Sequence, residues 1–391
     1  MIKRELTSEL KNVAKQFPVV AVLGPRQSGK TTLTQSTFKK YTYVSLEELD
    51  NRQDAITDPR HFLESHKNAH GIILDEIQNT PDLLSYIQTY VDKNKKPGYF
   101  ILTGSHNILL NEAISQTLAG RVSILTLLPL STGELNKAKL LTKSIEKTLF
   151  TGCYPRIYDE KIQPNKWYSN YIRTYIERDV RLLKNVSSLN LFQKFIKLCA
   201  GRIGQLLNLT SLGNDCGIST NTAKNWLSIL ECSYIIFLLR PHHKNFSKRL
   251  VKSPKLYFYD TGLACSLLEI DDPKELNTSY LRGNLFESFV LSEFIKNRYN
   301  KDLRPNLYFW RDNQGHEVDC IIEKGNNLTP IEIKISKTIN SSFFDELKYW
   351  NEIAKSKPEN AFLIYGGIEK RVRSGIKVFG WQSLNSVFSK I

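Results

Sequence analysis

The sequence predicts an α/β protein of several domains. Apolar runs of strand length occupy residues 19–23, 72–74 and 99–102, and each run ends in small or charged polar residues. Such runs are typical of buried parallel strands, which deliver polar side chains to one edge of a sheet. The chain has 391 residues, enough for two or three domains that each bury a core.

The first apolar run leads directly into a glycine-containing loop and then into a helix. Gly24 and Gly29 let the backbone curl, so that successive N–H groups and the helix dipole point at phosphate oxygens. Lys30 is expected to reach the β- and γ-phosphates, and the hydroxyl of Thr31 to hold Mg²⁺. The expected ligands are therefore ATP and Mg²⁺, and the expected ATP-binding residues are Gly24, Pro25, Arg26, Gln27, Ser28, Gly29, Lys30, Thr31 and Thr32.

The second apolar run ends in two adjacent carboxylates, Asp75 and Glu76. Asp75 is expected to complete the Mg²⁺ shell, and Glu76 to polarise the water that attacks the γ-phosphate. The third run ends near Thr103 and Ser105, either of which can hydrogen-bond the γ-phosphate or its water. An Asp-Glu pair favours hydrolysis over passive binding.

Arg121 precedes a further apolar run at residues 123–130. It is expected to act as a charged finger on a phosphate, and a structural arginine on a solvated helix end is the alternative.

These motifs together resemble those of the prokaryotic AAA-type ATPases that carry a DUF4143 domain at their C-terminus. The resemblance implies a P-loop core with Ser105 as its sensor residue and Arg121 as its finger. Cys153 stands where such proteins more often have a second glycine, a departure at the domain junction. The motifs are Gly24-Pro25-Arg26-Gln27-x-Gly29-Lys30-Thr31-Thr32, Leu74-Asp75-Glu76-Ile77-Gln78, Leu102-Thr103-Gly104-Ser105, Leu118-Ala119-Gly120-Arg121 and Gly152-x-Tyr154-Pro155.

Composition excludes disordered, fibrous and disulfide-scaffold classes. Hydrophobic residues make up 41% and charged residues 24% of the chain, an ordinary globular balance. The six cysteines form no C-x-x-C pair, which predicts buried thiols in a reducing compartment. No apolar run is long enough to cross a bilayer, so we expect a cytoplasmic protein without a membrane partner. The formal charge of +15 favours a negatively charged partner, of which DNA is the commonest.

Residues 209–230 read as a helix, a glycine-bearing turn and a second helix capped by Ser219 or Thr220. Two short apolar strands follow and predict a wing, with a basic tip between them at Arg240, His242, His243, Lys244, Lys248 and Arg249. A winged helix binds duplex DNA through its second helix, but it also serves ATPases as a lid or a protein-docking module. The candidates for the DNA groove are Thr220, Asn221, Thr222, Lys224 and Asn225.

The C-terminal part carries a second set of chemical residues. Glu287 lies in a predicted helix, Asp319 in a strand, and Glu332 and Lys334 two positions apart on a further strand. This order resembles the PD-(D/E)XK nuclease fold, although Val318 replaces the proline. Glu287, Asp319 and Glu332 are expected to hold Mg²⁺, with Asp319, Glu332 and Lys334 catalytic. A nuclease-like fold that binds nucleic acid without cutting is the alternative.

The expected architecture is therefore an AAA-type P-loop ATPase at 1–150, a helical linker at 151–205, a winged helix at 206–275 and a restriction-endonuclease-like α/β domain at 276–391. The leading hypothesis is an ATP-hydrolysing, DNA-associated protein with a Mg²⁺-dependent nuclease domain. The alternative is a nucleotide-dependent signalling switch that binds a protein partner and has an inert nuclease-like domain. A homo-oligomer is also compatible with the sequence, because Arg121 can act on the nucleotide of a second copy only in an assembly.

Overall fold

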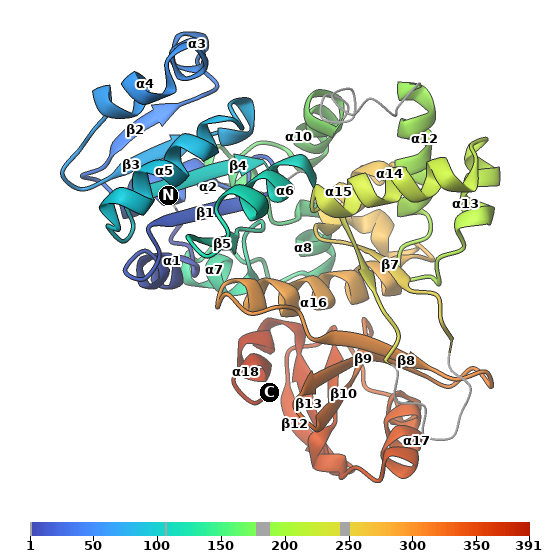
Figure 1. Ribbon diagram of the computed structural model, residues 1–391. Helices are drawn as coiled ribbons and strands as arrows, with labels where there is room; N and C mark the ends of the chain where they lie inside the picture. Colours follow the sequence, from blue (N-terminus) through green and yellow to red (C-terminus); the bar gives the residue numbers. More distant parts are fainter. Residues whose placement is uncertain (1, 106–107, 177–187, 243–250) are drawn as a thin grey trace. The chain divides into compact units, whose positions relative to one another are not determined.

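The computed structural model describes residues 2–105, 108–176, 188–242 and 251–391 (Figure 1). It divides the chain into two compact units. The first consists of Met1–Leu130 with Cys232–Tyr234 and Arg298–Leu303. The second consists of Ser131–Glu231, Ile235–Asn297 and Arg304–Ile391. Residues 131–150, expected in the ATPase domain, thus lie in the second unit.

The first unit is built on a five-stranded parallel sheet in the order β2-β3-β4-β1-β5. Strand β4 lies between β1 and β3, so the carboxyl ends of these three strands are neighbours. The elements are α1 (Thr7–Val13), β1 (Val19–Gly24), α2 (Lys30–Thr37), β2 (Thr42–Ser45), α3 (Leu49–Thr57), α4 (Pro59–Ser65), β3 (Ile72–Asp75), η1 (Ile77–Asn79), α5 (Leu83–Asn94), β4 (Phe100–Ser105), α6 (Ile108–Thr117) and β5 (Val122–Thr126).

Apolar side chains project from both faces of this sheet and form one hydrophobic core on each side. Along β1, Val19, Ala21 and Leu23 pack with helices α3 to α6, whereas Val20 and Val22 face helices α1 and α2. Successive strand residues point to opposite faces, so a strand covered on both sides must be apolar at every position. This explains the uninterrupted apolar run, and the strands predicted at 19–23, 72–74 and 99–102 are confirmed.

The second unit begins with helices that surround a short antiparallel pair, β6 and β7. Its first elements are α7 (Thr132–Lys137), α8 (Ile145–Thr151), α9 (Pro155–Asp159), α10 (Pro164–Tyr171), the π-helix η2 (Ile172–Ile176), α12 (Leu189–Ala200), α13 (Leu209–Cys216), α14 (Thr220–Cys232), β6 (Ile236–Leu239), β7 (Lys255–Phe258), α15 (Thr261–Leu267), η3 (Pro273–Asn277) and α16 (Arg282–Tyr299).

A six-stranded sheet in the order β12-β13-β11-β10-β9-β8 ends the chain. Strands β10, β11 and β13 run parallel, and α17 packs on one face of the sheet through Leu347 and Trp350. Its elements are β8 (Leu307–Arg311), β9 (Glu317–Lys324), β10 (Asn327–Lys334), η4 (Ser341–Phe344), α17 (Asp345–Ala354), η5 (Pro358–Asn360), β11 (Phe362–Tyr365), β12 (Lys370–Arg373), β13 (Ile376–Gly380), η6 (Trp381–Ser383) and α18 (Leu384–Phe388).

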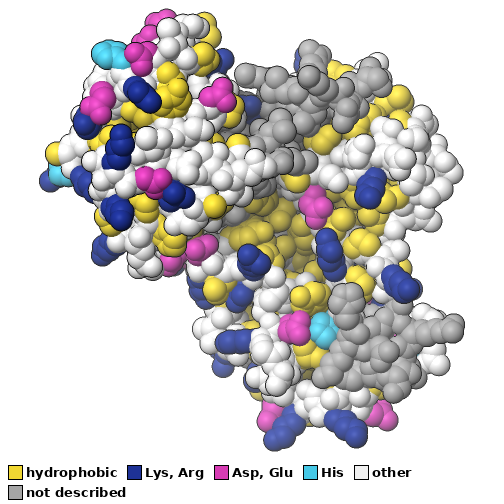
Figure 2. Space-filling view, viewed as in Figure 1, with side chains coloured by type: hydrophobic (Ala, Val, Ile, Leu, Met, Phe, Trp, Pro, Cys, Tyr) yellow, Lys and Arg dark blue, Asp and Glu magenta, His cyan; other side chains and the backbone are white. Residues whose placement is uncertain are grey.

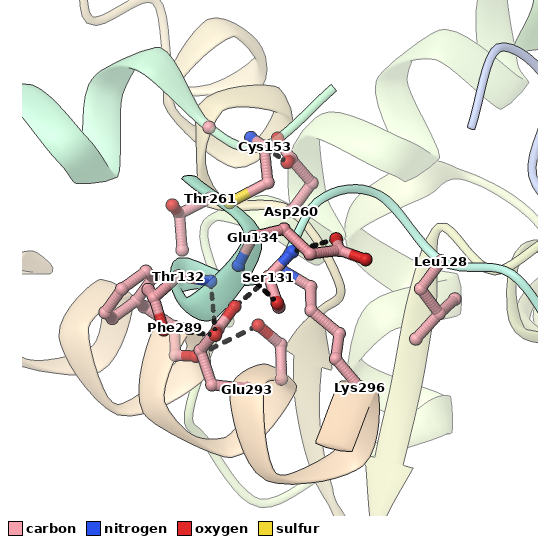
Figure 3. A network of polar contacts seen from close by, with 12 residues as sticks. Leu128, Ser131, Thr132, Glu134, Cys153, Asp260, Thr261, Phe289, Glu293 and Lys296 are labelled. Atoms are coloured by element: carbon pink, nitrogen blue, oxygen red, sulfur yellow. Dashed lines mark hydrogen bonds and ion pairs between the residues drawn. The ribbon is translucent and has the colours of Figure 1, made fainter. Parts of the chain in front are cut away.

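A buried ionic network ties the start of α7 to α16 within the second unit (Figure 3). The Glu293 carboxylate accepts hydrogen bonds from the backbone N–H of Thr132 at 2.7 Å and from its hydroxyl at 2.6 Å. Its other oxygen lies 2.8 Å from the Lys296 ammonium, and both side chains are at most 2% exposed. Ser131 and Glu134 close a capping box at the same helix end. Residues 131–137 are therefore held by the second unit's own polar interior.

Of the helices in the described part of the chain, none has the length and apolar character needed to cross a membrane.

The buried pair of Glu293 and Lys296 yields a test of this network. Substitution Lys296→Met leaves the Glu293 charge buried without its cation, and such losses cost about 3–5 kcal/mol. We expect that loss in urea unfolding. The control is Lys197→Met, which removes an equally short ion pair, 2.6 Å from Glu269, whose side chains are 51% and 75% exposed. If both substitutions lowered the free energy of unfolding by the same amount, the buried Glu293–Lys296 pair would be no more important for stability than the exposed one.

Candidate functional site

The loop between β1 and α2 has the conformation that the glycines were expected to permit. Gly29 is left-handed at φ 91°, and a Cβ at Gly24 would lie 2.2 Å from the Leu127 carbonyl oxygen. Lys30 is 5% exposed and donates to the carbonyl oxygens of Gly24 at 3.1 Å and Pro25 at 2.8 Å. Its ammonium group therefore lies over the loop. Of the remaining loop residues, Ser28 is buried, Arg26 and Gln27 are partly buried, and Thr32 is exposed.

Thr31 and Asp75 meet although they are far apart in sequence. The Thr31 hydroxyl lies 3.0 and 2.9 Å from the two carboxylate oxygens of Asp75. Tyr43 donates to Asp75 at 3.0 Å, and Thr103 also donates to it. Burial and the nearby Asp75 raise the pKa of Tyr43, so its hydroxyl stays a donor. The expected Mg²⁺ pair is thus assembled, and Tyr43 is a partner that the sequence did not point out.

Glu76 leads out of β3 in a strained conformation. Its φ of 58° is left-handed, which is unusual for a residue with a side chain and concentrates at functional sites. Ser105 donates to the Glu76 carboxylate at 3.4 Å, and Gln78 donates to the same oxygen. The structure therefore brings Glu76 and Ser105 together at the end of neighbouring strands, whereas Thr103 serves Asp75 instead.

Arg4 supports the loop from the amino-terminal segment. Its guanidinium donates to the carbonyl oxygens of Ser28 and Leu128, each at 2.6 Å, and the residue is only 8% exposed. The phosphate loop and the chain after β5 are thereby joined by one charged group. Sequence reasoning missed Arg4, because a single arginine ahead of a helix has no local signature.

Arg121 lies at the other edge of the sheet. Its carbonyl oxygen accepts the N–H of Val19, where β1 begins, whereas the phosphate loop follows Gly24 at the end of β1. Its guanidinium is bound by both carboxylate oxygens of Asp92, at 2.6 and 2.9 Å. Within one chain this residue forms a surface ion pair and is separated from the loop by the length of β1.

The segment from α13 to β7 has the elements expected for a winged helix. Gly217 is left-handed at φ 83°, and Ser219 caps the second helix by accepting the N–H of Thr222 at 3.1 Å. Thr220, Asn221, Lys224 and Asn225 are exposed, and Thr222 is partly buried. His242 is only 6% exposed, so it does not belong to an exposed tip. Residues His243, Lys244, Lys248 and Arg249 of that tip lie outside the described part of the chain.

The four C-terminal site residues come together in the second unit. Lys334 lies 3.5 Å from the Asp319 carboxylate and is also paired with Glu332. The same Asp319 oxygen accepts a hydrogen bond from the backbone N–H of Ile333 at 2.8 Å. Glu287 interacts electrostatically with both Asp319 and Glu332. We refer to Glu287, Glu317, Asp319 and Glu332 with Lys255 and Lys334 as the carboxylate-lysine cluster.

Lys255 of β7 and Glu317 of β9 are the members that the sequence did not predict. The Lys255 ammonium lies 3.3 Å from Glu287 and is paired with Glu317, and the Lys255 side chain is 5% exposed. Tyr257, two residues further along β7, donates to Glu287. The strand pair of the expected wing therefore delivers a cation and a hydroxyl into the cluster. The signal was the alternation of polar and apolar residues in Lys255-Leu256-Tyr257, which does not reveal its partner.

Burial is the main cause of the raised pKa values of Glu287 and Glu332. It raises the pKa of Glu287 to about 7, although Lys255 opposes the shift. Burial and Asp319 likewise raise the pKa of Glu332 well above its usual range. Burial acts to lower the pKa of Lys334, but Asp319 and Glu332 outweigh it and raise that pKa. Both lysines therefore stay charged as internal counter-ions.

The cluster does not have the form of a three-carboxylate metal centre. Among residues 2–105, 108–176, 188–242 and 251–391, no three His, Cys, Asp or Glu side chains are gathered as a metal-binding group. Lys334 is paired with Asp319 and Glu332, and Lys255 with Glu287, the carboxylates that were expected to share Mg²⁺. One feature still suits a cation: the second carboxylate oxygen of Glu332 is buried and has no hydrogen-bond partner among the described residues.

Comparison with known families divides the chain into three segments. Residues 16–136 match the AAA domain family, residues 142–274 match a domain of unknown function (DUF8612), and residues 282–384 match a domain of unknown function (DUF4143). The matches thus place an AAA domain ahead of a DUF4143 domain, in the order that the motifs had indicated. The DUF8612 match covers both the expected linker and the expected winged helix.

Two uncharacterized proteins, from Mycobacterium tuberculosis and Mycobacterium bovis, are each 29% identical to this chain over 354 residues. Each match covers 88% of this chain and 77% of the relative. Among solved structures, the Walker-type ATPase of Pyrococcus abyssi aligns with 14% identity and a TM-score of 0.47, over 68% of this chain and 96% of that protein. The domain assignment rests on the sequence families.

Arg4 offers a test of how the phosphate loop is held. Substitution Arg4→Ala removes two charge-assisted hydrogen bonds and leaves buried carbonyl oxygens unpaired, so the loop loses its fixed geometry. We expect the affinity for ATP to fall about tenfold, which corresponds to about 1.4 kcal/mol. The readout is binding of a fluorescent ATP analogue.

Two further variants separate positioning from general damage. Arg4→Lys keeps one cation and should give an intermediate affinity, and Lys3→Ala at the exposed neighbour should bind as the wild type does. Unchanged affinity in Arg4→Ala would show that the loop holds its shape without this residue.

Proposed function

We propose that this chain hydrolyses ATP at the loop between Gly24 and Lys30. The observation that carries the proposal is the meeting of Thr31 with Asp75, at 3.0 and 2.9 Å, beside a Glu76 that Ser105 contacts. A hydroxyl and a carboxylate at this spacing suit Mg²⁺ in its complex with nucleotide phosphates. The buried hydroxyl of Ser28 has no partner among the described residues, which also suits a ligand at the loop.

The residues of the site divide the work. Mg²⁺, when bound, neutralises charge on the β- and γ-phosphates. Lys30 exchanges its two carbonyl acceptors for phosphate oxygens, and the loop N–H groups donate to the same phosphates. Glu76 orients the attacking water and accepts its proton, while Gln78 and Ser105 hold the Glu76 carboxylate in place. Arg121 contributes only where a second copy presents its nucleotide.

ATP turnover by three variants tests this assignment. Glu76→Gln keeps the shape and hydrogen bonds of the side chain but removes the base, so we expect kcat to fall about a hundredfold or more with ATP still bound. Lys30→Ala should lose ATP binding itself. Lys93→Ala, an exposed lysine of the same unit, is the control and should be unaffected. Wild-type turnover by Lys30→Ala would contradict the proposal.

We further propose that the protein associates with nucleic acid. Support comes from the net charge of +15 and from the exposed polar face of α14, which carries Thr220, Asn221, Lys224 and Asn225. Figure 2 shows Lys and Arg side chains scattered over the visible face and not gathered in one patch. Net charge alone therefore does not locate the surface that contacts nucleic acid.

A second candidate is a nucleotide-dependent switch with a protein partner and an inert C-terminal domain. The pairing of Lys255 with Glu287 favours it, since this unexpected cation stands beside a carboxylate that a nuclease would use to hold a metal. The partner would then dock on α13 and α14. A wild-type protein that hydrolyses ATP but does not bind nucleic acid would favour the switch.

Because the Lys255 ammonium is paired with Glu287, one of the expected Mg²⁺ ligands, we expect no cleavage of linear, circular or single-stranded DNA in the presence of Mg²⁺, with or without ATP. Gel electrophoresis of labelled DNA is the measurement, and an ATPase assay on the same preparation shows that the protein is active. Cleavage that both Asp319→Ala and Lys334→Ala abolish would contradict this expectation and establish a nuclease.

A further inference from the structure

The second unit contains a groove of about 520 Å³ at one edge of its six-stranded sheet. The strands β10, β11 and β13 are parallel, and they end side by side at Lys334, Tyr365 and Gly380. The groove is lined by residues that directly follow these ends, including Lys337, Gly366 and Trp381. Crevices outside the carboxyl ends of parallel strands are the usual ligand sites of open α/β sheets.

Three cations reach this groove from three separate parts of the chain. They are Lys143, which precedes α8, Lys337, which follows β10, and Arg371 on β12. One lining carboxylate, Glu369, lies 3.4 Å from Arg371, and both are about half exposed or more. The lining is therefore positive overall, and segments distant in sequence contribute to it.

A carboxylate behind the groove is already neutralised by another cation. Glu146 lies 3.4 Å from Lys337, but it is also 2.7 Å from Arg282. Burial acts to raise its pKa, yet hydrogen bonds from its backbone, Ser144 and Arg282, together with the charge of Lys337, hold that pKa at about 2. Glu146 is thus a fixed charge shared with Arg282, and Lys337, whose side chain is 63% exposed, remains open to an anion.

Glycine gives the groove a wall without side chains. A Cβ at Gly366 would lie 2.0 Å from the Ile335 carbonyl oxygen, and one at Gly367 would lie 2.2 Å from the Tyr365 ring. These contacts leave no room for another residue. Packing within the protein therefore requires glycine at both positions, and both residues line the groove.

We propose that this groove binds the phosphodiester backbone of a nucleic-acid strand through Lys143, Lys337 and Arg371. The inference rests on the proposed association with nucleic acid and assigns its contact to a groove that the DUF4143 segment lines together with Lys143 of the DUF8612 segment. Spaced cations suit successive phosphates, which position a strand without reading its sequence. Because β10 carries Glu332 and Lys334 just before the groove, a bound strand would pass close to the carboxylate-lysine cluster.

Binding of a labelled single-stranded oligonucleotide and its duplex to the full chain tests the proposal. Fluorescence anisotropy is measured over a range of salt concentrations for the wild type and for Lys337→Glu combined with Arg371→Glu. We expect the double variant to bind about tenfold more weakly or worse, and the slope of log affinity against log salt to fall by about one for each lost phosphate contact.

The matched control is Lys274→Glu combined with Lys348→Glu. Both lysines are exposed in the second unit and neither lines the groove, so this pair makes the same change in net charge. Equal weakening by the two double variants would overturn the proposal, because only net charge would then matter. ATP turnover is measured on every variant to show that the chain is folded.

Two other outcomes have separate meanings. If the wild type and the groove variant bind the oligonucleotide equally well, the groove is not the binding site, but the proposed association with nucleic acid is supported. Absence of oligonucleotide binding by the wild type would end both. Binding of inorganic phosphate is measured directly by calorimetry on the wild type and the groove variant; phosphate binding that only the variant loses, with no oligonucleotide bound by the wild type, would show that the ligand is a free phosphate compound and that the nucleic-acid assignment is wrong.

Discussion

A carboxylate that leaves water needs hydrogen-bond donors or a cation, and this requirement organises both units of the protein. In the first unit, Asp75 is 6% exposed and receives the hydroxyls of Thr31, Tyr43 and Thr103. In the second unit, Glu293 is paired with Lys296, and Glu287 with Lys255. An unpaired ionised group in these places would be too costly to keep.

The kind of partner decides what each buried carboxylate can do next. Hydroxyl groups satisfy the hydrogen bonds of Asp75 but leave its negative charge uncompensated, and a carboxylate has about four acceptor positions for three hydroxyl donors. The Thr31 hydroxyl contacts both Asp75 oxygens, so an arriving cation would replace a hydroxyl contact there. Lysines neutralise the carboxylates around Glu287 and Glu332, so a cation arriving there must displace an ammonium group. The same residue type thus has different capacities in the two units.

Local spacing explains what could be predicted. The loop from Gly24 to Thr31 is a continuous segment whose chemistry depends on neighbours in sequence, and Glu332 and Lys334 share a strand face for the same reason. The strands that end at Asp75 and Ser105 were predicted from apolar runs, and their order in the sheet then brought them together. Resemblance to a family added the C-terminal segment, which the match at residues 282–384 confirms.

Partners from distant segments explain what could not be predicted. Arg4, Tyr43 and Lys255 each act through a residue at least 24 positions away, and nothing in their own neighbourhood indicates that contact. The first unit ends at Leu130 because helix α7, which follows, is bound by residues of the second unit. Its partner Glu293 lies 161 positions from the Thr132 that it binds, so the boundary has no local signal. Arg121 was expected beside a phosphate, but the register of β5 with β1 places it at the amino ends of the strands.

Strand β4 shows how the two adjacent carboxylates of the first unit are connected. Thr103 and Ser105 are two residues apart, so their side chains point to the same face of the sheet. One contacts Asp75 and the other contacts Glu76. A movement of either carboxylate therefore changes a hydrogen bond to the same strand. Asp75 and Glu76, which we propose to bind Mg²⁺ and to orient the water, are in this way connected through β4, so a nucleotide that repositions Glu76 would also affect Asp75.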